Sequence, residues 1–264
     1  MFSAFTTHAT LTRQLVIREI SARYRGSVMG VLWSLFTPIL MLGIYTFVFN
    51  YVFKARWPMV SEEGEVLNFA MVLFLGLIIH GLVADTVTRS PRLILDNVNL
   101  VKKVVFPLES LAWVMILNAL FNFMISLALL LIFVYWELGH IPLTALWLPL
   151  VLLPYVVILM GLSWILACLG VYLQDLQQIS GTAATLLLFL SPVFYSITIL
   201  PENVQPFIYL NPITLIVESA RAVLLYGNPP DFRALGIYAV IAIAFFTLGY
   251  ALFQKARKGF ADVV

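Results

Sequence analysis

The sequence predicts an all-α protein that crosses a membrane several times, and two features of its composition predict this class. Of the 264 residues, 62% are hydrophobic and only 11% are charged, whereas soluble domains carry about 25% charged residues. Six stretches without any charge run for 19 to 37 residues, and a helix needs roughly 20 apolar residues to cross the hydrocarbon core. A soluble helical core would not bury so many apolar helices. We therefore expect six spans, at residues 31–53, 66–87, 108–136, 143–172, 181–200 and 234–254.

Residues 10–25, before the first span, have the pattern of a helix that lies on the membrane surface. Glu19 and Arg23 form a favourable i,i+4 pair, and such a helix places its arginines at the lipid headgroups. A plain basic flank of the first span is the alternative. The first span itself is expected to be an uncleaved signal anchor, because it is too long for a signal peptide and no small-residue cleavage site follows it. The polar stripe of the surface helix consists of Gln14, Arg18, Ser21 and Arg25.

The longest polar segment between two apolar runs is 89–107, between the second and third spans. Its middle, 93–105, is predicted to form a short amphipathic helix that cannot cross a bilayer. The segment carries a single acid, Asp96. Its four basic residues are Arg89, Arg92, Lys102 and Lys103.

Residues 201–233 differ from the other long segments, since they contain five prolines and several charges. Cytoplasmic loops of membrane proteins are enriched in Lys and Arg. With a cytoplasmic N-terminus and six spans, eleven of the fifteen Lys and Arg residues lie inside. If 204–226 also spanned, the basic C-terminal tail would lie outside. We therefore expect 201–233 to be a re-entrant helical pair at an outer mouth, and Pro192 to kink or unwind the fifth span.

The sequence contains none of the short motifs that carry common enzymatic chemistry. It has no Walker A pattern, no CxxC and no HExxH. His80 and Asp85 lie in or near the second span, where an ionisable residue is a functional candidate. Because five positions separate them, they do not stack on one helical face. Packing or capping is favoured over a proton relay, and the compact His/Asp pair of a membrane acyltransferase is missing.

The first span has an aromatic face. Aromatic faces stack on sugar rings, because C–H bonds meet the π-cloud while the hydroxyls stay hydrated. The alternatives are packing, lipid contact and the aromatic belts of membrane interfaces. The face consists of Trp33, Phe36, Phe47 and Tyr51, with Leu40 and Ile44 between them.

Three stretches together resemble one family. They are LTRQLVIREISARYRGSVMGVLWSLFTPIL at 11–40, VKKVVFP at 101–107 and NPITLIVESARAVLLYG at 211–227. They are similar to the permease subunits of ABC-2 type exporters, above all those for O-antigen, capsular polysaccharide or teichoic acid. The resemblance covers nearly the whole chain. One departure is Gln174 before Asp175, where many relatives have a basic residue.

The resemblance implies a homodimeric transport subunit, not an enzyme, in the bacterial inner membrane. Two copies of a separate ATP-binding subunit would hold ATP and Mg²⁺, so this chain is expected to hold no cofactor. No nucleic acid is expected among its partners. The re-entrant segment would gate the outer mouth through Asn211, Pro212, Glu218 and Arg221. The first and fifth spans would line the channel, which adds Phe194 and Tyr195 to the aromatic face. Coupling to the ATPase would fall on Asp96, Asn97, Val98, Asn99, Leu100, Lys102 and Lys103.

The expected substrate is a glycan linked to a polyprenyl pyrophosphate. Arginine binds phosphate in two places through its planar fork, so Arg18, Arg23 and Arg25 are candidates for the pyrophosphate contact. Ordinary positive-inside anchoring is the alternative. Two other classes stay open: an ABC-2 exporter of a lipid, drug or peptide, and an ATP-independent flippase. The flippase would need paired ionisable groups near mid-membrane, which the spans almost lack.

Overall fold

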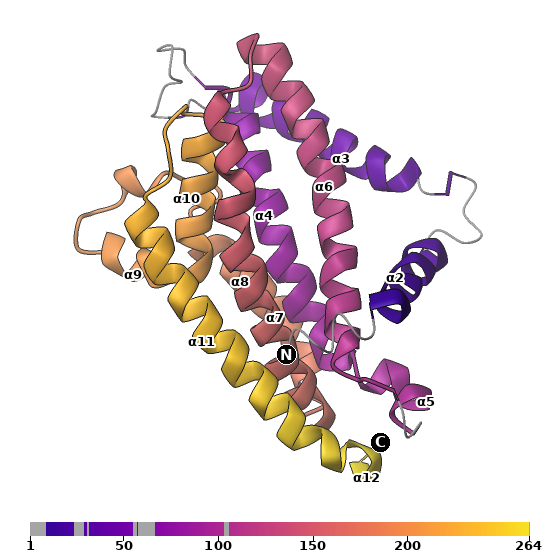
Figure 1. Cartoon of the computed structure of the whole chain (residues 1–264). Helices are drawn as coiled ribbons and strands as arrows, with labels where there is room; N and C mark the ends of the chain where they lie inside the picture. The colour runs from indigo at the N-terminus through magenta and orange to yellow at the C-terminus, as the bar shows by residue number, and fades with distance from the viewer. Residues whose placement is uncertain are drawn as a thin grey trace.

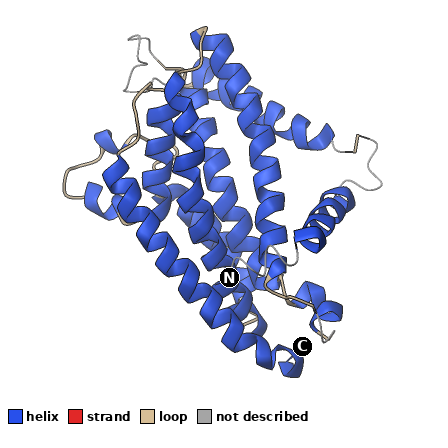
Figure 2. Ribbon diagram, in the orientation of Figure 1, coloured by secondary structure: helices blue, strands red, loops and turns tan. Residues whose placement is uncertain are grey.

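The computed structural model describes residues 9–23, 29–30, 32–54, 57, 67–102 and 106–263, with backbone only at 9–10, 22–23 and 261–262. Helices joined by turns and loops make up this described part, which contains no strand (Figure 2). This confirms the predicted all-α class. Five of the helical segments are long and apolar enough to span a membrane: 32–52, 69–92, 110–138, 143–172 and 232–259.

The helix α4 (Phe69–Arg89) forms the centre of the bundle (Figure 1). It packs against α6 (Ser110–Leu138), α7 (Leu148–Tyr172), α8 (Leu176–Leu190) and α10 (Pro212–Leu224). Within its most apolar window, 72% of the residues are buried inside the protein. The second span is therefore a core helix.

The helices α7 and α11 (Phe232–Ala256) approach so closely that their backbones touch. A Cβ added at Gly161 would lie 2.7 Å from the backbone oxygen of Phe245, and one at Gly249 would lie 2.4 Å from the oxygen of Gly161. Small residues allow such contact between membrane helices. Gly170 gives α7 a similar contact with the backbone of Pro91.

The predicted fifth span at 181–200 is wrong in its bounds, because α8 starts five residues earlier and ends at Leu190. At 15 residues and 1.5 Å per residue, α8 is about 22 Å long, less than the hydrocarbon core of about 30 Å. Ser191 is extended (φ −100°, ψ 150°), as expected for the residue before a proline, Pro192. Much of the polar loop expected at 173–180 is the first turn of this helix.

The first two helices lie at the edge of the bundle. α2 (Ala9–Arg23) packs on α6, and α3 (Leu32–Tyr45) continues as the π-helix η1 (Thr46–Val52). Only 6% of the most apolar window of this span is buried. Its far end is held by Asn50, whose amide donates to Asn68 Oδ1 at 2.8 Å.

The predicted re-entrant segment contains two helices, α9 (Gln205–Tyr209) and α10, as expected from its apolar pieces. The short elements that complete the fold are η2 (Ser90–Arg92), η3 (Leu95–Asn97), α5 (Val98–Val101), η4 (Leu143–Trp147), η5 (Ile197–Ile199), η6 (Arg257–Gly259) and α12 (Phe260–Val263). α5 and α12 both lie toward the lower end of Figure 1. Of the expected loop at 54–65, only Lys54 and Trp57 are described.

Candidate functional site

Arg221 on α10 is the most heavily bonded charged side chain of the described residues. It is fully buried, and its guanidinium donates to the carbonyl oxygens of Pro192 at 2.6 Å and Val193 at 2.9 Å. It also pairs with Glu218 Oε1 at 2.9 Å. Burial lowers the pKa of Arg221, and the Glu218 carboxylate opposes that shift. These bonds satisfy the non-helical backbone that follows α8, which a membrane-embedded segment requires.

The same guanidinium connects three further parts of the chain. Its Nη2 lies 3.5 Å from the Val72 oxygen of α4, and its Cζ lies 4.6 Å from the centre of the Trp57 ring. Trp57 in turn donates to the Tyr226 hydroxyl at 2.8 Å. Gly76 on α4 leaves room for the group, since a Cβ there would lie 3.2 Å from Arg221 Nη2. We call Arg221 with these partners the Arg221 cluster.

The predicted gate residues therefore meet around one segment. Asn211 caps α10 through the Ile213 amide and donates to the Ser191 hydroxyl at 2.9 Å. Pro212 occupies the first turn of α10, where its missing N–H costs nothing. Asn211 and Arg221, near opposite ends of α10, thus both form hydrogen bonds with residues 190–193.

The predicted coupling segment is helical but not one continuous helix. It consists of η3 and the four-residue α5, with Val98 and Leu100 half-buried and Asn99 exposed. Asp96 pairs with Arg92 at 3.6 Å on an exposed surface, which contributes little to stability. The Asn97 amide donates to the Leu93 oxygen at 2.9 Å. Lys102 is exposed, and Lys103 lies outside the described residues.

A hydrogen-bonded junction ties α2 to this end of the bundle. Glu19 on α2 forms an ion pair with Arg89 of α4 and accepts from the Asn118 amide of α6 at 3.0 Å. Arg18 and Arg92 join Arg89 and Glu19 in lining a cavity of about 390 Å³, which we call the basic cavity. Of the other predicted arginines, the Arg23 side chain and the whole of Arg25 lie outside the described residues.

The aromatic face of the first span is present, and the described residues leave it largely exposed. Its four rings are between 40% and 72% exposed, so packing within the described chain does not explain them. Trp33 and Phe36 form an edge-on pair with centroids 5.4 Å apart, and Phe47 and Tyr51 form a second pair at 6.4 Å.

Phe194 and Tyr195 lie on the non-helical segment after α8, not on a helical wall as expected. Phe194 stacks on Phe189 with centroids 5.6 Å apart, and the Tyr195 hydroxyl donates to the Phe189 oxygen at 3.4 Å. The predicted channel residues thus fall into two separate groups of rings.

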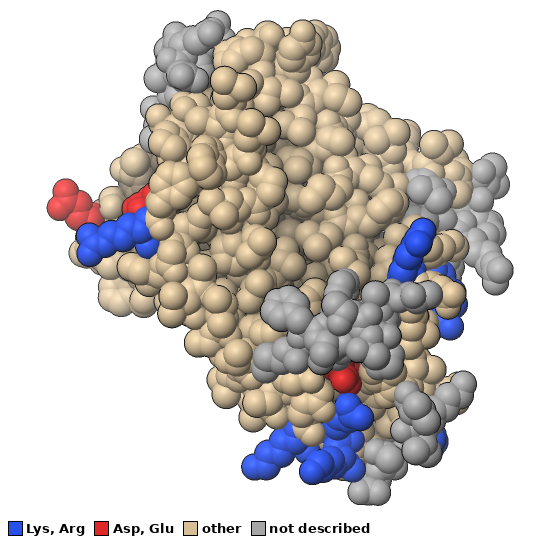
Figure 3. Space-filling model, viewed as in Figure 1, with Lys and Arg blue, Asp and Glu red and all other residues tan. Residues whose placement is uncertain are grey.

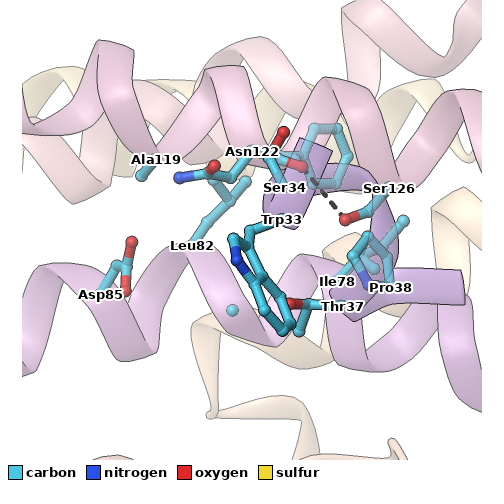
Figure 4. A pocket seen from close by; sticks show the side chains of 12 residues that line it. Trp33, Ser34, Thr37, Pro38, Ile78, Leu82, Asp85, Ala119, Asn122 and Ser126 are labelled. Atoms are coloured by element: carbon cyan, nitrogen blue, oxygen red, sulfur yellow. Dashed lines mark hydrogen bonds between the residues drawn. The ribbon is translucent and has the colours of Figure 1, made fainter. Parts of the chain in front are cut away.

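His80 and Asp85 have different surroundings on α4. His80 is buried, and its Nε2 lies 3.1 Å from the Ala184 oxygen of α8, so it packs the bundle as favoured from the sequence. Asp85 instead lines a cavity of about 440 Å³ between α3, α4 and α6 (Figure 4). The described residues include no group of three or more His, Cys, Asp or Glu able to hold a metal ion.

Sequence reasoning missed the partners that come from distant segments. Trp57 and Tyr226 are 169 residues apart, and Glu19 and Asn118 are 99 apart. The only available signal was chemical: an Arg or Glu in an apolar setting needs a partner. That signal identifies Arg221 but not the residues around it.

Long apolar helices packed around a charged, tightly bonded segment define a polytopic helical membrane protein. The sequence matches the ABC-2 type transporter family over residues 10–225, and the chain belongs to this family. It is 30% identical over 256 residues to the O-antigen export system permease protein RfbA of Myxococcus xanthus, covering 95% of this chain and 94% of that protein. RfbA of Klebsiella pneumoniae is 24% identical over 248 residues, with 94% and 92% covered. The polysialic acid transport protein KpsM of Escherichia coli is 24% identical over 261 residues, with 97% of each covered.

Proposed function

We propose that this chain is the permease subunit of an ATP-driven exporter that moves a lipid-linked, O-antigen-like polysaccharide across the bacterial inner membrane. The observation that carries the proposal is the similarity over almost the full length to permeases named for O-antigen export and polysialic acid transport. As a member of the ABC-2 type transporter family, the chain would be a transport component and not an enzyme in its own right. The energy would come from ATP and Mg²⁺ bound by two copies of a separate subunit.

The uncovered face of α3 supports a homodimer. The four rings on α3 and η1 contact one another in two pairs and are 40% to 72% exposed within the described protomer. A second protomer would bring an equal face, and two such faces can enclose a channel. Sugar rings would then pass between stacking surfaces, with their hydroxyls hydrated in the channel.

The distribution of charge supports a cytoplasmic location for the lower end of Figure 1. Lys and Arg atoms gather there in Figure 3, and α11 and η6 end there with Lys255, Arg257 and Lys258. Positive residues favour the cytoplasmic side, so both termini would be cytoplasmic. Arg18, Arg23 and Arg25 would meet the pyrophosphate of the carrier, and Arg18 already lines the basic cavity.

The mechanism follows from this placement. The segment from Arg89 to Pro107 would receive the motion of the ATPase through Asn99 and Lys102, which are exposed beside the half-buried Leu100. The ion pair of Arg89 with Glu19 would carry that motion to α2. The two protomers would then rock apart while the re-entrant pair opens the outer mouth.

Reconstitution into proteoliposomes tests the proposal. The chain together with its ATP-binding subunit should move lipid-linked glycan only when ATP is hydrolysed. The chain alone should neither move the glycan nor hydrolyse ATP. Movement without a second subunit would make the chain a flippase, and ATP-driven movement of other lipids, drugs or peptides but not glycan would assign that substrate class. Reversing the charge of Lys102 and Lys103 to Glu should uncouple hydrolysis from export; unchanged export would remove this segment from the mechanism.

A further inference from the structure

The cavity beside Asp85 combines polar and aromatic groups in the membrane-spanning part of the bundle. Its lining includes Trp33 and Thr37 from α3, Asp85 from α4, and Asn122 and Ser126 from α6. Figure 4 shows the indole of Trp33 between α4 and α6, with Asp85 and Asn122 extending into the same space. We call this space the polar cavity.

The Asp85 carboxylate is the unusual member of this group. No hydrogen bond or ion pair joins it to another of the described residues, although α4 is the most buried of the described spanning helices. Its side chain is only partly buried and borders the open space of the cavity, so hydrogen-bond donors of a ligand in that space can reach it.

The other lining groups restrict which donors fit. Ser126 donates its hydroxyl proton to the Asn122 backbone oxygen at 3.1 Å, which leaves its oxygen free to accept. Thr37 adds a second hydroxyl and Trp33 a flat apolar face. Acceptors and hydroxyls around an indole suit a ring with O–H groups at its edge and C–H groups on its face. The volume, about 440 Å³, lies within the range of about 300–1,000 Å³ typical of small-molecule pockets.

The position of the cavity adds a second argument. Asp85 precedes Arg89 by about one turn of α4, and Arg89 lines the basic cavity. On α6, Ala119 of the polar cavity follows Asn118, the partner of Glu19. The arginine-containing basic cavity and the hydroxyl-lined polar cavity thus adjoin, as a ligand with a sugar joined directly to phosphate would require.

The geometry points to a saccharide subsite in the polar cavity that holds the sugar next to the carrier pyrophosphate. Asp85 and Ser126 accept hydrogen bonds from sugar hydroxyls, and Trp33 stacks on the ring. This assignment rests on the proposed function, because it takes the substrate to be a lipid-linked glycan.

Binding to the exporter complex in lipid nanodiscs tests the subsite with two probes: lipid-linked glycan extracted from the source cells, and bare polyprenyl diphosphate. Asp85→Asn should weaken binding of the glycan-bearing lipid about tenfold, since charge-assisted hydrogen bonds are lost, and leave bare-carrier binding within about twofold. Asp175→Asn, at an exposed carboxylate before α8, should change neither. Should Asp85→Asn fail to assemble, Ser126→Ala and Thr37→Val provide the same comparison.

The outcomes separate the subsite from the proposed function. A wild-type complex that does not bind the glycan-bearing lipid would overturn both. A wild-type preference for that lipid that persists in Asp85→Asn, Ser126→Ala and Thr37→Val would overturn only the subsite, as would equal weakening of both probes. Loss of the dimer without a change in preference would assign the polar cavity to contact with the second protomer and would also overturn the subsite.

Discussion

The helices α3 and α10 differ in burial, and the difference is the opposite of what hydrophobicity alone would predict. α3 has no charged residue, yet only Leu42 is buried in it. α10 carries Glu218 and Arg221, yet nine of its thirteen residues are buried. Lipid solvates an apolar helix as well as protein does, whereas charges and non-helical backbone inside a membrane must be satisfied by protein. Between these two helices burial therefore follows polarity, and the exposed apolar helix is free to meet lipid, substrate or a second protomer.

Replacing Arg221 with Gln should have the largest effect on stability. It removes the donors to two backbone carbonyls and leaves Glu218 without its partner. Breaking a buried pair by removing one partner costs about 3–5 kcal/mol. Thermal unfolding of the detergent-solubilised protein, followed by size-exclusion chromatography, measures the loss. Arg233→Gln, at an exposed arginine of α11, is the control, and equal stability of the two variants would show that α10 is not held by its charge.

Replacing Gly170 with Ala should cause the second-largest loss of stability. The added Cβ would lie 1.9 Å from the backbone oxygen of Pro91, so α7 and η2 must separate. Overpacking of this kind costs about 1–3 kcal/mol. The matched control on the exposed helix is Gly43→Ala, where no atom lies within 4 Å of the new Cβ. It should be neutral or slightly stabilising, and the same unfolding assay compares them. A loss at Gly43 would mean that α3 is packed in the assembled protein.

The sequence was sufficient for the parts of the fold that depend on composition. Uncharged runs located five spanning helices to within a few residues, because length and apolarity alone define a span. The fifth run forms a shorter helix than predicted, because its backbone leaves the helix at Ser191 and is bonded by Arg221, which lies about 30 residues later. Such partnerships, like that of Trp57 with Tyr226, depend on how helices pack and leave no periodic signal.

The candidate site was predictable to a similar extent. Arg221 and the aromatic face were visible as chemically unusual residues in apolar runs. The polar cavity was not, because Thr37, Asp85 and Ser126 come from three helices; only Asp85 was noticeable on its own, as an ionisable residue in or near a span. The functional assignments of these residues stay predictions.

Replacing Glu19 with Gln tests how α2 is attached to the bundle. The effect on stability should lie between those expected for the buried α10 and the exposed α3. The pair with Arg89 is about one-third exposed, so the variant should lose at most about 1 kcal/mol. Export per ATP hydrolysed should nevertheless fall roughly fivefold or more, within the usual range of coupling energies, if α2 receives motion through this pair. Transport and hydrolysis measured in the same proteoliposomes give the ratio. Glu202→Gln, at an exposed site beside α9, is the control, and an unchanged ratio in Glu19→Gln would exclude this route.

Replacing both Trp33 and Phe36 with Leu should have the smallest effect on stability and a clear effect on function. Both rings are about 40% exposed, and substitutions at such positions usually change stability by less than about 0.5 kcal/mol. Leucine keeps the helix apolar and helical but cannot stack on a sugar ring. Glycan export should therefore fall while the unfolding temperature and the dimer stay unchanged. Normal export would indicate that the aromatic face contacts lipid and not glycan. A drop in stability would show that the face is packed against a second protomer. In that case α3 would be buried in the assembly, as α10 is in the protomer.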